Sequence, residues 1–232
     1  MSAVAGSTHR HTRLRAAAGD RSAAADVLAA GVDALAIALA PAQRDAIARY
    51  LALLAKWNGR FNLTAIREPS RMITHHALDA LAALPRLPQE RGLRVLDVGT
   101  GGGVPGILLA IARPDWQVTL LDASQKKGAF VTQAVIELGL ANVVVAIRRV
   151  EDFVAAEGYD IVISRAFASL ADFAEGALRH VAPNGHLYAM KGVMPDAEIA
   201  ALPPEVGVVA AMPIEVPGLD ARRSLVVMRR AR

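Results

Sequence analysis

The chain contains no cysteine among its 232 residues, so it forms no disulfide bond and no thiolate metal site. The six histidines show no spacing typical of metal ligands, and we expect no metal. The absence of cysteine is compatible with the cytoplasm, where we expect the protein to lie. No apolar run reaches the roughly 18 to 20 residues that cross a bilayer, which favours a soluble protein without a membrane partner. Aromatic residues make up 4% of the chain, too few for an extended base-stacking platform.

Acidic residues are scarce near the N-terminus, where four arginines among the first 24 residues face only Asp20. The whole chain carries a net charge of +4. We expect residues 1–23 to form a disordered basic arm, although the same composition suits contact with RNA phosphates or a transit peptide. The length and the 53% hydrophobic content predict one α/β domain with an appendage. We expect the appendage to be an N-terminal helical cap over 24–88 and the main, cofactor-binding domain to span 89–232.

Hydrophobic periodicity supports this division. Helical spacing is found around Pro41 to Asn58 and after Pro69, whereas short apolar runs typical of buried parallel strands begin near Leu93. The last two expected strands follow each other without a helix, which predicts an antiparallel pair ending a mostly parallel, seven-stranded sheet. The expected strands are 93–98, 116–121, 142–147, 159–164, 185–190, 207–214 and 223–229, and the expected helices between them are 104–113, 124–138, 170–182 and 195–202.

The most informative segment is a glycine-rich turn after the first expected strand. Five glycines fall between positions 99 and 106, where a strand ends and a helix is expected to begin. Gly99, Gly101, Gly103 and Gly106 tolerate positive φ and leave no side chain between the backbone and a ligand, and Pro105 suits the first helical turn. This arrangement predicts a Rossmann-like site for a nucleotide-like ligand.

Two carboxylates lie near the turn, and only Asp97 separates S-adenosylmethionine from NAD, because both ligands carry the ribose diol that Asp122 would reach. Asp97 precedes the first glycine and would repel a pyrophosphate, but it can face the amino acid end or the sulfonium of S-adenosylmethionine. Asp122 ends the next strand about 20 residues on, where an acid reaches ribose hydroxyls or caps the following helix. We therefore expect S-adenosylmethionine as the cofactor, with an NAD-linked oxidoreductase as the alternative.

Other candidate residues follow the later strands. Glu151 and Asp152 come after the third strand, where a carboxylate can accept the adenine amino group and a backbone N–H can serve a ring nitrogen. Arg165 follows the fourth strand, where it can enter the crevice, pair with Asp97 or Asp160, or do both. Lys191 follows the fifth strand as a second cation or as an ordinary exposed lysine.

Several motifs together resemble the bacterial family of 16S ribosomal RNA guanine-N7 methyltransferases, RsmG or GidB, over roughly residues 40–230. The resemblance implies a class I methyltransferase that methylates N7 of one guanine in the RNA of the 30S subunit. The residues by themselves leave another RNA base or a protein open as the substrate. It implies cofactor contacts at Gly99, Val104, Val150, Glu151 and Arg165. The motifs are Lys56-Trp57-Asn58-x-x-Phe61-Asn62-Leu63-Thr64, His76-x-x-Asp79, Asp97-Val98-Gly99-Thr100-Gly101-x-Gly103-x-Pro105-Gly106, Arg149-Val150-Glu151 and Ser164-Arg165-Ala166-Phe167-Ala168-Ser169.

Guanine N7 carries a free lone pair and no proton, so its methylation needs placement rather than a general base. We expect Arg165 to act in catalysis by orienting the cofactor, guanine O6 or a phosphate while leaving N7 free. Asn62, Thr64, His76 and Lys191 are expected to bind the substrate. Alternatively, His76 and Asp79 pair with each other across one helical turn. We expect the enzyme to act as a monomer.

Overall fold

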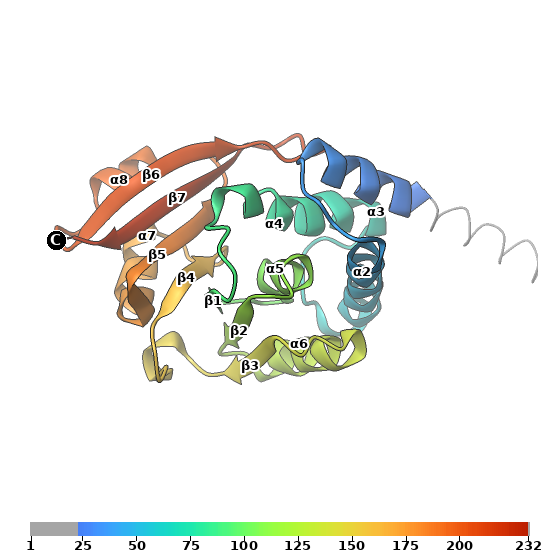
Figure 1. Ribbon diagram of the computed structural model, residues 1–232, viewed down its shortest axis with the longest axis horizontal. Coiled ribbons are helices and arrows are strands. Elements are labelled where there is room, and N and C mark those ends of the chain that lie inside the picture. Colours follow the sequence, from blue (N-terminus) through green and yellow to red (C-terminus); the bar gives the residue numbers. More distant parts are fainter. Residues whose placement is uncertain (1–22, 232) are drawn as a thin grey trace, which may run out of the picture.

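Seven strands form a single sheet in the order β3-β2-β1-β4-β5-β7-β6 in the computed structural model, which describes residues 23–231 (Figure 1). The first five strands pair in parallel, whereas β7 pairs antiparallel with both β5 and β6. The predicted Rossmann-like α/β fold with a terminal antiparallel pair is therefore confirmed. The strands are β1 (Arg94–Val98), β2 (Gln117–Asp122), β3 (Val143–Ile147), β4 (Tyr159–Ser164), β5 (Val181–Lys191), β6 (Val206–Ile214) and β7 (Arg223–Arg230).

Helices cover both faces of the sheet, so successive strand residues are buried in different layers. Val95 of β1 packs with α5 (Gly106–Ala112) and α6 (Gln125–Leu138) on one face, whereas Leu96 packs with α7 (Leu170–Ala177) on the other. Burial on both faces explains the nearly continuous apolar runs of these strands. The short helices are α8 (Asp196–Ala200) and the 3₁₀ turns η2 (Leu84–Arg86), η3 (Val150–Asp152) and η4 (Leu178–His180).

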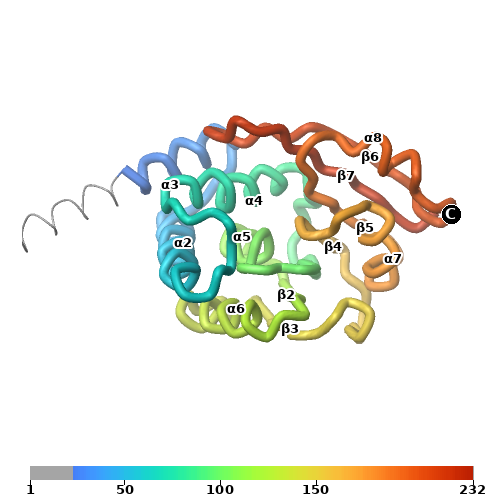
Figure 2. Tube along the Cα trace, turned by 180° about the vertical axis from the view of Figure 1, so that it is seen from behind, coloured from blue at the N-terminus to red at the C-terminus, as the bar shows by residue number. Residues whose placement is uncertain are grey.

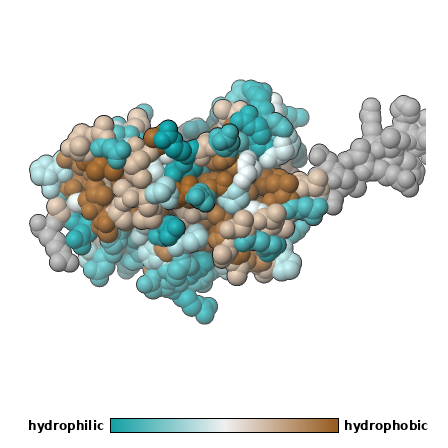
Figure 3. Space-filling view, turned by 90° about the horizontal axis from the view of Figure 1, so that it is seen from above, coloured by the Kyte–Doolittle hydropathy of each residue, from teal (hydrophilic) through white to brown (hydrophobic). Residues whose placement is uncertain are grey.

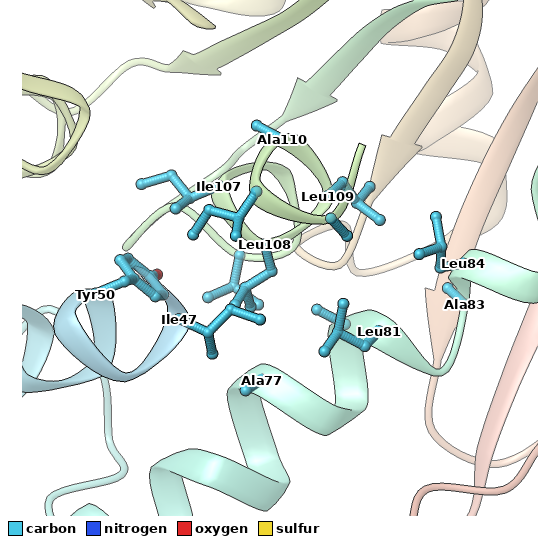
Figure 4. Close-up of a cluster of buried hydrophobic side chains, with 14 of the residues drawn as sticks. Ile47, Tyr50, Ala77, Leu81, Ala83, Leu84, Ile107, Leu108, Leu109 and Ala110 are labelled. Carbon is cyan, nitrogen blue, oxygen red and sulfur yellow. The ribbon is translucent and has the colours of Figure 1, made fainter. Parts of the chain in front are cut away.

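The N-terminal helices form a further layer outside α5 and α6 (Figures 1 and 2). They comprise the helix at 23–34, α2 (Pro41–Phe61) and a helix whose parts are α3 (Pro69–Met72), the π-helix η1 (Ile73–Leu78) and α4 (Asp79–Leu81). Figure 4 shows Ile47 of α2, Leu81 of α4 and Leu108 of α5 in one buried cluster, and all three side chains are fully buried. This shared core fixes the N-terminal helices against the glycine turn that precedes α5.

Some predicted boundaries are wrong. The first crossover helix starts at Gly106 rather than at 104, because Pro105, after a cis peptide bond, occupies the N-cap position and not the first helical turn. The helix expected over 170–182 ends at Ala177, continues as η4 and gives way to β5 at Val181. Residues 1–22 of the predicted basic arm lie outside the described residues.

The outer edge of the sheet is apolar. Strand β6 carries no charged residue, and Val208 and Val209 are 40% and 50% exposed. Figure 3, seen from above, shows apolar residues gathered over the β6–β7 end and over the N-terminal helices, with hydrophilic residues between them. Within residues 23–231, no helix combines the length and the apolar character that crossing a membrane requires.

Candidate active site

The glycine turn follows β1 at the carboxyl edge of the sheet. Gly99, Gly101 and Gly103 have φ values of 71°, 60° and 92°, which confirms the expected left-handed backbone at these positions. Gly106 serves a different purpose, because a Cβ atom there would lie 2.7 Å from Oδ2 of Asp97. The fourth glycine therefore allows the start of α5 to lie against a buried carboxylate.

That carboxylate, Asp97, is completely buried beneath the turn. Its Oδ2 accepts hydrogen bonds from the Thr100 hydroxyl at 2.6 Å and from the Gly106 N–H at 2.8 Å, while its Oδ1 has no partner among the described residues. Burial raises the pKa of Asp97 to about 6, against the lowering effects of these two hydrogen bonds. The N-terminus of α5 thus faces a fixed negative charge, which disfavours a pyrophosphate at this position.

Asp122 ends β2 and holds the turn from the other side. Its Oδ2 accepts a hydrogen bond from the Gly101 N–H at 2.9 Å, and its Oδ1 accepts one from the Ser124 N–H at 2.8 Å. The N-cap of α6 is Ser124, so Asp122 is not the capping residue. The Asp122 side chain is about 10% exposed, and Lys127 Nζ lies 3.9 Å from its Oδ2.

Three adjoining compartments lie along this edge of the sheet. The turn compartment, of about 190 Å³, and the outer compartment, of about 230 Å³, share Gly99. The third, the basic compartment, of about 310 Å³, shares His76 and Arg165 with the turn compartment. The turn compartment is lined by Leu54, Leu63, Thr64, His76, Gly99–Gly102, Val104, Lys127, Arg165 and Ala166. The outer compartment is lined by Val98, Gly99, Leu121–Ala123, Arg148–Glu151 and Phe167. The basic compartment is lined by Ile66, His75, His76, Asp79, Arg165, Met190–Gly192, Ile214, Arg223 and Ser224.

Arg165 stands at the boundary of two compartments. Its Nη1 donates to Asp79 Oδ2 and to the His75 carbonyl, both at 2.9 Å, and its Nη2 lies 3.3 Å from His76 Nδ1. Asp79 is 2% exposed, and its Oδ1 accepts a hydrogen bond from Arg223 Nε at 2.8 Å. The expected partners of Arg165, Asp97 or Asp160, are therefore wrong, and Asp79 holds two arginines at once.

The π-helix explains how a carbonyl group within a helix is free to accept a hydrogen bond from Arg165. In an α-helix the Asp79 N–H would donate to the carbonyl four residues earlier, which belongs to His75. Here that N–H donates to Thr74 and His76, while the His75 carbonyl accepts from Arg165. Single π-helical turns are frequent at functional sites because they redirect backbone and side-chain groups.

His76 is neutral in this environment. Burial and the nearby Arg165 charge lower its pKa to about 4. An arginine has no acceptor, so Nδ1 accepts from Arg165, and Nε2–H donates to the Thr64 hydroxyl oxygen at 3.0 Å. His76 and Asp79 therefore do not pair through their side chains, which makes the alternative expectation wrong; each instead contacts Arg165.

Val150 and Glu151 lie where expected, at the outer compartment. Val150 is buried, Glu151 is exposed, and both line the compartment beside Asp122. Val104 is 6% exposed and lines the turn compartment together with Thr64.

Two expected substrate residues are placed differently from the rest. Asn62 is exposed, ends α2 in the left-handed conformation and accepts a hydrogen bond from Arg67, and it lines none of the three compartments. Lys191 lines the basic compartment, but its Nζ lies 2.9 Å from Glu198 Oε2 and donates to the Ala168 carbonyl. Lys191 is thus neither free nor an ordinary exposed lysine.

Three residues at or beside the site were given no role by sequence reasoning. Arg223 begins β7, and an antiparallel strand brings its amino end to the edge where the parallel strands end, so the predicted hairpin itself contained the signal. Lys127 lies in the first turn of α6, next to the predicted Asp122. Asn58 is 3% exposed and bonds both Thr64 N–H and the Ile66 carbonyl, which holds the loop after α2 in place. Among residues 23–231 there is no cluster of three or more His, Asp or Glu that could hold a metal ion.

Comparison with known sequences gives extensive matches. The family model GidB, described as rRNA small subunit methyltransferase G, matches residues 43–226. The ribosomal RNA small subunit methyltransferase G of Burkholderia ambifaria is 51% identical over 219 residues, which are 93% of this chain and 96% of that protein. The protein of the same name from Laribacter hongkongensis is 50% identical over 199 residues, covering 86% of this chain and 95% of the relative.

Solved structures share the fold at low sequence identity. TrmN from Thermus thermophilus matches with a TM-score of 0.55 and 23% identity, covering 74% of this chain and 52% of that chain. Coclaurine N-methyltransferase, bound to N-methylheliamine and S-adenosylhomocysteine, matches with a TM-score of 0.57 and 14% identity over 78% of each chain. These likenesses show the class I methyltransferase fold.

Proposed function

This chain belongs to the rRNA small subunit methyltransferase G family, and we propose that it transfers a methyl group from S-adenosylmethionine to N7 of one guanine in the 16S RNA of the small ribosomal subunit. The observation that carries the proposal is the position of Arg165 and His76, which line both the turn compartment and the basic compartment. A donor in the first compartment therefore meets a base in the second across a short shared boundary. The NAD-linked alternative is wrong for a member of a methyltransferase family.

The residues of the cleft fit S-adenosylmethionine. The turn and outer compartments join at Gly99, and together they fall in the size range of small-molecule sites, about 300–1,000 Å³. We assign Asp122, Val150 and Glu151 to the adenosine part of the cofactor, and Gly99, Gly101, Gly103 and Val104 to its amino acid part. Asp97 acts through the turn, because its buried charge favours a cationic ligand over an anionic one.

S-adenosylmethionine supplies an electrophilic methyl group on a positively charged sulfur. Guanine N7 needs no base, and the residues at the boundary agree with this requirement. His76 is neutral, with its Nδ1 accepting from Arg165 and its Nε2–H donating to Thr64, so neither ring nitrogen is free to accept a proton. The contribution of these residues is therefore orientation and electrostatics.

Arg165 is the residue we expect to orient the reactants. Three of its five N–H groups are engaged by Asp79, His75 and His76, which fix the plane of the guanidinium. The remaining two N–H groups can donate to guanine O6 or to a phosphate and leave N7 unengaged. Thr64, His76 and Lys191 complete our proposed substrate-binding set, whereas Asn62 supports the loop from outside.

The electrostatics of the edge suit an RNA substrate. Arg148 and Arg149 are exposed at the outer compartment, and Arg223 lines the basic one. Basic side chains beside a site provide the salt-dependent phosphate contacts that dominate RNA affinity. We further propose that the enzyme acts as a monomer in the cytoplasm, where ribosomal RNA is its substrate.

A methyl-transfer assay tests the proposal. Purified protein is incubated with methyl-labelled S-adenosylmethionine and with 30S subunits from cells that lack the modification, and label in the RNA is counted. We expect about one methyl group per subunit and none on subunits that already carry the modification. Absence of label with well-folded protein would contradict the proposal, whereas label on another RNA base would favour the alternative substrate.

A further inference from the structure

A tyrosine of the N-terminal helices contacts the glycine turn from behind. Tyr50, in α2, is fully buried, and its hydroxyl donates a hydrogen bond of 2.5 Å to the Gly102 carbonyl. Its ring lies against Phe130 of α6, with 6.5 Å between ring centroids, and Figure 4 shows Tyr50 beside Ile107 of α5. Tyr50 does not line the turn compartment, whereas Gly102 does.

The other hydrogen bonds that join the backbone of the turn to neighbouring elements come from the sheet side. The Gly99 N–H donates to the Leu121 carbonyl at 2.8 Å, and the Gly101 N–H donates to Asp122. Among the described residues, the Gly102 carbonyl accepts no other hydrogen bond than that of Tyr50. Since glycines restrict the backbone little, a single fixed carbonyl has a large influence on which conformation the turn adopts.

The hydroxyl group is a dependable donor. Burial raises the pKa of Tyr50 above its ordinary value, so the phenol stays protonated at physiological pH. The packing of the turn against α2 is also tight, because a Cβ atom on Gly102 would lie 3.2 Å from Cδ1 of Leu54, another residue of α2. The turn therefore has little room to move toward α2.

We infer that Tyr50 is a positioning residue for the cofactor: it holds the glycine turn in the conformation that receives S-adenosylmethionine and so sets cofactor affinity without touching the ligand. This inference rests on the proposed function for the identity of the ligand. It assigns to the N-terminal helices a role in cofactor binding, in addition to lining the site.

Tyr50→Phe tests the inference, because it removes the hydroxyl and keeps the ring that packs on Phe130. The dissociation constant for S-adenosylhomocysteine, measured by calorimetry, is expected to rise about threefold to tenfold, as for loss of one buried hydrogen bond. The KM for S-adenosylmethionine should rise by the same factor, while kcat at saturating cofactor and the KM for 30S subunits stay within twofold. Hydrogen exchange of the amides at 101–104 should become faster.

Tyr159→Phe is the matched control. Tyr159 is also buried, and its hydroxyl donates to Thr119 Oγ1 at 3.1 Å, within the sheet and away from the compartments. This variant should bind S-adenosylhomocysteine like the wild-type protein, even if its melting temperature falls as much as that of Tyr50→Phe. Tyr50→Phe with unchanged affinity and a lowered melting temperature, or with a lowered kcat alone, would overturn the inference. Failure of the proposed function would appear separately, as wild-type protein that transfers no methyl group to 30S subunits.

Discussion

Replacing Asp97 with asparagine should change how the stability of the protein depends on pH. Asp97 is completely buried, and burial raises its pKa from 3.8 to about 6. In the unfolded chain the carboxyl group loses its proton near pH 3.8, but in the folded protein it holds the proton until about pH 6. The stability contributed by this group is therefore complete below pH 3.8 and is lost as the pH rises to 6.

The magnitude follows from the two pKa values. A tenfold change in proton affinity corresponds to about 1.4 kcal/mol. Ionisation of the buried Asp97 therefore lowers the free energy of unfolding by about 3 kcal/mol at neutral pH. Asparagine does not titrate and lacks this cost. Its amide nitrogen, however, would occupy the position of Oδ1, which has no partner, at a pH-independent cost of about 1–3 kcal/mol.

The assay is urea unfolding of both proteins at several pH values from 4 to 8. The difference in unfolding free energy, variant minus wild type, should increase by about 2 to 3 kcal/mol between pH 4 and pH 7 and then level off, because all other titrating groups cancel. Thr100→Val provides a second test. It removes the hydroxyl hydrogen bond that lowers the pKa of Asp97, so this variant should lose more stability than the wild type over the same range.

Parallel stability curves for Asp97→Asn and the wild type would refute this reasoning. They would mean that Asp97 titrates in the folded protein as it does in the unfolded chain. The conclusion that burial disfavours the ionised form of Asp97 would then be wrong, although the carboxylate would still be negatively charged at neutral pH.

Four further predictions concern the site and its support. Arg165→Ala should lower kcat/KM about a hundredfold in the 30S methylation assay, since misplacement of the reactants costs that much; wild-type turnover and cofactor affinity would remove its proposed role. Gly106→Ala should destabilise the protein by about 1–3 kcal/mol in urea unfolding, because its Cβ would overlap Leu120, whereas Gly59→Ala in α2, with no heavy atom within 4 Å, should not. NMR titration should find His76 neutral down to about pH 4, and a midpoint near 6.5 would contradict its burial beside the arginine. Raising the salt concentration should increase the KM for 30S subunits and leave S-adenosylhomocysteine affinity nearly unchanged; equal insensitivity of both would exclude phosphate contacts.

The features predicted from sequence are those with local signals. The glycine turn, Asp122 and the position of Arg165 after β4 follow from residue types at strand ends, because parallel strands all end at one edge of the sheet. The antiparallel end of the sheet followed from a missing crossover helix. Each of these predictions needed no knowledge of how distant segments pack.

The parts that were missed or wrong depend on packing between distant segments. Arg165 and Asp79 are 86 positions apart, and nothing local to either residue indicates that they pair. The π-helix that frees the His75 carbonyl has no sequence pattern of its own. In the sequence, Tyr50 looks like one more apolar residue of an amphipathic helix. Only the structure shows that its hydroxyl donates a hydrogen bond to the Gly102 carbonyl.

The position of the transferred methyl group tests the central claim most directly. RNA from the 30S methylation reaction is digested to nucleosides, and the labelled nucleoside is identified by mass spectrometry against standards. The account predicts 7-methylguanosine as the single labelled product, formed by a site that provides no general base. A methyl group on an exocyclic amine or on a ribose hydroxyl, where a proton must be removed, would contradict it.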